Sequence, residues 1–193
     1  MARIAPVPRN EWPPEMRDAV AAMRPPTPRH PDPVRENRPK GIVTLGAFAN
    51  HVELAHAFFT FNGHILFATT LTPRQREILV LRVAARRKSA YLWAEHLFAA
   101  RDAGLTDEEI ARVAFGPDAP YFEPLETALL RAADELVDDG VVSDETWRAL
   151  ASELDAKQLL DVVFTVGCYQ IVGSFFRSLD MEPDPEIPEL LQR

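Results

Sequence analysis

The chain has 193 residues, of which 47% are hydrophobic and 26% are charged, and its formal net charge is −8. This length suits one medium-sized domain with a real core, and the composition is ordinary for a soluble globular protein. The acidic balance excludes a polyanion such as a nucleic acid as a favoured partner. Cys168 is the single cysteine, which excludes an intrachain disulfide framework and fits a reducing cytoplasm.

The sequence shows neither a signal peptide nor a membrane span. No N-terminal apolar run follows a basic start, and no segment offers about 18 uninterrupted apolar residues. We therefore expect a cytoplasmic protein with no membrane partner.

Residues 1–40 form a distinct arm, because ten of the chain's 17 prolines lie there. Pro13 and Pro14 can start a short helix from Glu15 to Met23, but residues 25–40 are too rich in proline to be helical and should be extended. Two interpretations of the arm stay open: a basic strap across the protein or a neighbouring subunit, and a flexible leader. Its charged residues after Met23 are Arg24, Arg29, Asp32, Arg35, Glu36, Arg38 and Lys40.

The pattern after the arm is helical, with helices predicted over 42–49 and 52–68 and Asn50 as a cap between them. Glu53 and His56 have the i, i+3 spacing of di-iron bundles, but such sites need a second copy and two further glutamates. No second copy exists in the sequence. We therefore expect both residues to be exposed and predict no metal site.

A helix pair over residues 72–104 carries the only chemical signature. Thr72 suits a helix N-cap, Pro73 suits the first helical position, and a capping-box glutamine follows at position 75. The first helix should end near residue 87. After a polar corner, Ser89 can cap a second helix that ends before Gly104.

Each helix of this pair carries one titratable side chain on its apolar face. On a helical wheel, Glu77 lies opposite the polar edge that includes Arg82. His96 lies among small apolar side chains, whereas Glu95 belongs to a solvent-facing edge. An inward carboxylate and an inward imidazole on consecutive helices can form an acid/base pair. They are equally compatible with a structural ion-pair glutamate and a hydrogen-bonded core histidine, so both interpretations stay open.

The remainder of the chain reads as four further helices. A capping box at residues 106–109 opens a helix to residue 114, and helices over 124–139 and 144–154 follow. Asp155 and Gln158 open a last, largely apolar helix to about residue 179, which should be central or lie at a subunit contact. Within it, Gly167 and Gly173 should permit close packing. Cys168 and Tyr169 could reach the pocket of Glu77 and His96, but we expect both to pack in the core.

These patterns predict an all-α fold, a compact helical bundle with an extended proline-rich N-terminal arm. No strand-like alternation of useful length occurs. We divide the chain into the arm (1–40, with one short helix), a helical domain (41–182) and a C-terminal tail (183–193).

Segments 76–84, 91–96 and 103–105 together resemble the carboxymuconolactone decarboxylase and alkyl hydroperoxidase D-like superfamily. The resemblance covers roughly residues 40–180 and is most specific around His96. It implies the alkyl hydroperoxidase D-like fold and matches Glu77 and His96 to the family's glutamate and histidine. In the hydroperoxidase branch, a Cys-x-x-Cys precedes the histidine; here Ser89 and Leu92 occupy those positions. The decarboxylase-like branch usually has a glutamate in place of Leu92.

The resemblance implies a cofactor-free, decarboxylase-like lyase that acts by proton transfer on a small organic acid or lactone. His96 would be the acid/base group and Glu77 would orient or charge it. Similar proteins form trimers or hexamers, so we expect a homotrimer or homohexamer. Alternatives are a non-catalytic helical oligomer that binds a small ligand or a partner protein and, with less support, a hydroperoxide reductase. Expected substrate-binding residues are Ser89, Tyr91, Leu92 and Trp93.

Overall fold

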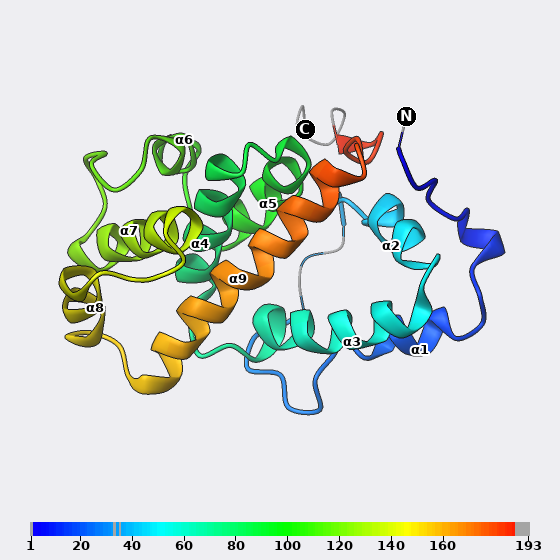
Figure 1. The fold of residues 1–193 in the computed structure, drawn as a ribbon, viewed down its shortest axis with the longest axis horizontal. Coiled ribbons are helices and arrows are strands. Elements are labelled where there is room, and N and C mark those ends of the chain that lie inside the picture. Colours follow the sequence, from blue (N-terminus) through cyan, green and yellow to red (C-terminus); the bar gives the residue numbers. More distant parts are fainter. Residues whose placement is uncertain (1, 33, 35, 188–193) are drawn as a thin grey trace. The chain divides into compact units, whose positions relative to one another are not determined.

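The structure is a computed structural model that describes residues 2–32, 34 and 36–187. Within these residues every regular element is a helix (Figure 1), which confirms the all-α prediction. Arg35 of the basic arm and residues 188–193 of the predicted tail lie outside the described residues.

The chain forms two compact units, one containing the residues up to Thr69 with those from Ser178 onward, the other Thr70–Arg177. The boundaries at residues 40 and 182 were drawn from composition and stay predictions.

The first unit contains five short elements. They are η1 (Arg9–Glu11), α1 (Met16–Ala21), α2 (Ile42–Phe48), α3 (Val52–Gly63) and the π-helical turn η2 (His64–Ala68). The chain after α1 lies so close to α3 that a Cβ atom on Gly63 would be 2.0 Å from the carbonyl oxygen of Met23. The Asp184 carboxylate accepts hydrogen bonds from the backbone N–H groups of Ile42 and Val43, and so caps the start of α2.

The predicted cap between α2 and α3 was wrong by one residue. His51 is the N-cap, and its Nδ1 atom accepts a hydrogen bond from the backbone N–H of Leu54 at 3.3 Å. The Asn50 amide instead donates to backbone carbonyls, including that of Ala5. Glu53 and His56 are both exposed on α3.

The second unit is built around α4, which packs against α5, α6 and α7 (Figure 1). Its buried apolar cluster includes Ile78 and Leu81 from α4 and Leu130 from α7. The six helices are α4 (Pro73–Arg86), α5 (Ala90–Asp102), α6 (Asp107–Phe115), α7 (Pro124–Asp138), α8 (Asp144–Ala151) and α9 (Ala156–Ser178).

Local capping chemistry sets most of these helix starts, as predicted. Thr72 forms a capping box with Gln75 at the start of α4. Ser89 accepts from the backbone N–H of Leu92 and caps α5. Because these bonds satisfy backbone donors that lie outside the helical ladder, the short sequence signals were sufficient to locate the helices. The remaining caps are Thr106 with Glu109, Ser143, and Asp155 with Gln158.

Two side-chain orientations from the helical wheel were wrong. Arg82, expected on the polar edge of α4, is only 4% exposed. Its guanidinium forms a bidentate pair with Asp134 of α7, so burial costs no unpaired charge. Glu95, expected to face solvent, is half-buried. A wheel computed for one helix contains no information on which neighbouring helix covers its polar edge.

Helix α9 is buried on one face and exposed on the other. Its length and composition would allow it to cross a membrane, and half of its most apolar stretch is buried inside the structure. Leu160, Phe164 and Ile171 are exposed. A Cβ atom on Gly173 would lie 3.6–3.7 Å from the α4–α5 corner, whereas one on Gly167 would meet nothing within 4 Å. Close packing is therefore found at Gly173 only.

Candidate active site

The tight corner between α4 and α5 brings the two predicted titratable side chains together. The Oε2 atom of Glu77 lies 2.7 Å from the Nδ1 atom of His96. Glu77 is completely buried, and the His96 side chain is 14% exposed. The inward orientation of both side chains, predicted from helical periodicity, is confirmed.

Arg76 is the second partner of Glu77. Its Nε atom donates a hydrogen bond to Oε1 of Glu77 at 2.8 Å, and its side chain is 11% exposed. Burial raises the pKa of Glu77, but the charges and hydrogen bonds of His96 and Arg76 outweigh burial and hold that pKa below its ordinary value. The carboxylate is therefore ionised at neutral pH. Sequence reasoning missed Arg76, because adjacent residues on a helix do not face each other; its place beside Glu77 in the matched motif was the available signal.

The ionised Glu77 defines which nitrogen of His96 remains for chemistry. A carboxylate only accepts hydrogen bonds, so the Nδ1 atom of His96 carries a proton that it donates to Glu77. The other ring nitrogen, Nε2, is then the atom that can exchange a proton with a bound molecule. It accepts a proton when the imidazole is neutral and donates one when the ring is an imidazolium. The arrangement can therefore exchange a proton with a small molecule that reaches the exposed edge of His96.

Tyr169 of α9 is buried in the core, as predicted, and it also packs against His96, the alternative that the sequence left open. The two ring centroids are 4.9 Å apart and the ring planes meet at 89°. Burial raises the pKa of Tyr169 well above its ordinary value, and the negative charge of Glu77 raises it further. The phenol therefore stays protonated at neutral pH and does not act as a base.

The neighbouring Cys168 is buried, and burial raises the pKa of its thiol to about 12. Since the thiolate is the reactive form of cysteine, this thiol is inert at neutral pH.

The four expected substrate-binding residues all take part in packing or capping. Ser89 is buried at the N-cap of α5. Tyr91 stacks on Phe176 with a centroid separation of 4.0 Å. Leu92 is 1% exposed and Trp93 packs against the buried apolar cluster. Contact of any of the four with a substrate stays a prediction.

Among the described residues, no group of three or more His, Cys, Asp or Glu side chains is arranged to hold a metal ion. The expectation that the site works without a metal or cofactor stays a prediction.

Residues 53–135 match the model of the carboxymuconolactone decarboxylase family, and this range contains Arg76, Glu77 and His96. Together with the all-helical fold, this match supports the carboxymuconolactone decarboxylase and alkyl hydroperoxidase D-like superfamily. No curated protein matches the sequence.

Three solved structures share the fold. A peroxidase-related protein from Silicibacter sp. TM1040 is 16% identical with a TM-score of 0.76, over 96% of this chain and 93% of that chain. An alkylhydroperoxidase AhpD core protein from Ralstonia eutropha JMP134 is 19% identical with a TM-score of 0.67, over 84% and 95%. The debrominase Bmp8, in a variant bound to 2,3,4-tribromopyrrole, is 14% identical with a TM-score of 0.74, over 98% and 95%.

Proposed function

We propose that this protein is a cofactor-free, decarboxylase-like lyase that acts on a small organic acid or lactone in the cytoplasm. The superfamily includes enzymes, since the family is named for a decarboxylase and one structural neighbour is a debrominase. The observation that carries the proposal is the 2.7 Å contact between Glu77 and the Nδ1 atom of His96, which leaves Nε2 for a substrate proton.

In the proposed reaction, the substrate carboxylate is β or vinylogous to a carbonyl group. The bond to the carboxylate carbon breaks, CO2 leaves, and the electron pair forms an enolate. The Nε2 atom of imidazolium His96 then donates a proton to the enolate carbon, and solvent returns a proton to the imidazole. Glu77 stabilises the imidazolium, and the positive charge of Arg76 keeps Glu77 ionised.

The direct test measures turnover in variants of the pair. Each of His96→Ala and Glu77→Gln should lower turnover by about 10²-fold or more, the range expected for a positioned acid/base group. Small carboxylates with a β or vinylogous carbonyl, and lactones, form the substrate panel. His56→Ala, which removes an exposed imidazole on α3, is the matched control and should retain full turnover. A substrate that is turned over equally well by His96→Ala would refute the assignment.

One observation supports the non-catalytic alternative. Leu92 is buried against α9. The decarboxylase-like branch usually has a glutamate at this position, so this site has no second acid. A pure binding protein would retain a small ligand without converting it, which calorimetry and product analysis of the same mixture distinguish from catalysis.

Hydroperoxide reduction through a disulfide needs an attacking and a resolving thiol. The sequence holds one cysteine, and that thiol is inert, so we do not propose this activity. Cys168→Ser should leave the native turnover unchanged.

We also propose that the protein is a homotrimer or homohexamer. Exposed Leu160, Phe164 and Ile171 on one face of α9 are compatible with a subunit contact. Light scattering at micromolar protein concentration tests the assembly, and a monomeric mass would contradict it.

A further inference from the structure

The hydrogen bond to Glu77 is not sufficient to hold His96 in one orientation. A single contact at Nδ1 leaves the imidazole free to tilt about the Glu77–His96 axis, and tilting moves Nε2 away from any bound molecule. Tyr169 supplies a second contact, edge to face, at 4.9 Å between ring centroids. Because the two rings are almost perpendicular, this contact restricts the tilt that the hydrogen bond permits.

Tyr169 is itself held by contacts on both sides along α9. Eight residues earlier, the Asp161 carboxylate accepts hydrogen bonds from both the backbone N–H and the hydroxyl group of Thr70, each at 2.6 Å. Four residues later, Gly173 lies against the α4–α5 corner. Further along the helix, Phe176 stacks on Tyr91. The segment that carries Glu77 and His96 therefore determines where the Tyr169 ring lies.

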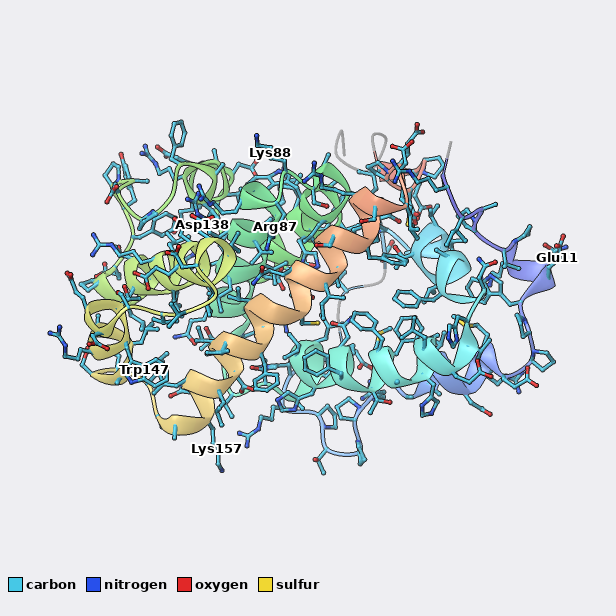
Figure 2. The ribbon with its side chains drawn as sticks, viewed as in Figure 1. Glu11, Arg87, Lys88, Asp138, Trp147 and Lys157 are labelled. Carbon is cyan, nitrogen blue, oxygen red and sulfur yellow. The ribbon has the colours of Figure 1, made fainter. Side chains whose placement is uncertain are left out.

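The side chains of the α4–α5 corner add polar contacts to α9. Figure 2 shows Arg87 next to α9, whereas the neighbouring Lys88 projects outward. The Arg87 guanidinium donates to the side-chain oxygen of Gln170, the residue after Tyr169, and the Gln170 amide donates to the backbone carbonyl of Leu136 at 3.2 Å. The backbone around Tyr169 is thus attached to both the α4–α5 corner and α7.

We propose that Tyr169 is a positioning residue that holds the plane of the His96 imidazole, so that Nε2 keeps one direction toward a substrate while Glu77 holds Nδ1. Its consequence for turnover rests on the proposed function, whereas its effect on the imidazole does not. Tyr169 lies outside residues 53–135 that match the family model.

The test compares Tyr169→Phe, which keeps the ring, with Tyr169→Leu, which removes it. In NMR relaxation of the His96 ring C–H groups, wild type and Tyr169→Phe should show a rigid imidazole. Tyr169→Leu should show a more mobile ring, while Nδ1 keeps its proton on the hydrogen bond to Glu77 in all three proteins. On a substrate of the wild-type enzyme, Tyr169→Leu should lower kcat by about 10-fold with KM changed less than about 2-fold, and Tyr169→Phe should restore kcat.

The NMR result decides the positioning role even if no substrate is turned over, so failure of the proposed function is distinguishable from failure of this inference. A His96 ring that is as rigid in folded Tyr169→Leu as in wild type would overturn the proposal. If Tyr169→Leu does not fold, Tyr169→Met takes its place. In wild type, nuclear Overhauser contacts between the His96 and Tyr169 ring protons are required, and their absence would also overturn it.

Discussion

Helix α4 carries two buried charges, Glu77 and Arg82, whose surroundings differ in one important respect. Every nitrogen of the Arg82 guanidinium is used within the protein, by Asp134 and by the backbone carbonyls of Val113 and Ala114 at the end of α6. Glu77 is equally well paired, but one of its partners is His96, a titratable ring whose second nitrogen is not occupied by Glu77.

This difference separates a structural charge from a candidate functional one. A guanidinium has no proton to give in ordinary protein chemistry, so the Arg82–Asp134 pair is suited to structure alone. An imidazole is a group that exchanges protons, so the Glu77–His96 pair is the one suited to proton transfer. Burial and pairing alone therefore do not identify an active site; the decisive feature is a titratable partner with an atom still available.

The largest expected change in the free energy of unfolding comes from removing the structural charge, Arg82. Arg82→Ala should lower the free energy of unfolding by about 3 kcal/mol. It leaves the carbonyls of Val113 and Ala114 without their donor and Asp134 with only the longer, 3.5 Å contact from Arg86. Chemical denaturation measures the change. Arg101→Ala, which removes an exposed pair with Asp107, is the control and should cost less than about 1 kcal/mol. Equal effects of the two variants would contradict the structural role of Arg82.

A smaller effect is expected at Gly116, which lies against the Arg82 guanidinium. A Cβ atom there would lie 2.6 Å from an Arg82 nitrogen, and the residue has φ = +110°, a conformation that side chains rarely adopt. Gly116→Ala should therefore lower the free energy of unfolding by about 1–3 kcal/mol. At Gly173 the same change meets only ordinary contacts, so Gly173→Ala should be neutral or stabilising by about 1 kcal/mol. Thermal unfolding measures both variants. If Gly116→Ala were the more stable of the two, the packing around Arg82 would not be tight.

The smallest effect on stability is expected at the functional candidate. Glu77→Gln is nearly isosteric and should cost only about 1 kcal/mol at pH 7, in the range for a modified buried hydrogen bond. The pKa of Glu77 is lower in the folded protein than its ordinary value of 4.5. The ionised carboxylate therefore stabilises the fold at pH values above 4.5, and this contribution is lost as the pH falls below 4.5 toward the folded-state pKa. The stability difference between wild type and Glu77→Gln should therefore narrow between pH 5 and pH 3. A difference that widens on acidification would contradict the lowered pKa.

Local sequence was sufficient for helix starts and for the two inward side chains. Thr72, Ser89 and Thr106 bond to backbone N–H groups within three residues, so their roles depend on nothing distant. Glu77 and His96 face inward because a period of 3.6 residues places them among apolar neighbours. The helix pair, its corner and the inward orientation of Glu77 and His96 were therefore predictable from the order of the amino acids, whereas their direct contact was only one of the possibilities that the sequence left open.

The partners of these residues depended on tertiary packing. Arg82 is buried because α7, some 50 residues later, brings Asp134 to it, and Tyr169 reaches His96 from α9 across 73 residues of sequence. Helical periodicity specifies which face of a helix is apolar, but not which helix covers that face or which polar groups it brings. For this reason the inward Glu77 and His96 could be recognised in the sequence, whereas the perpendicular contact of the Tyr169 ring with His96 was decided by the packing of α9.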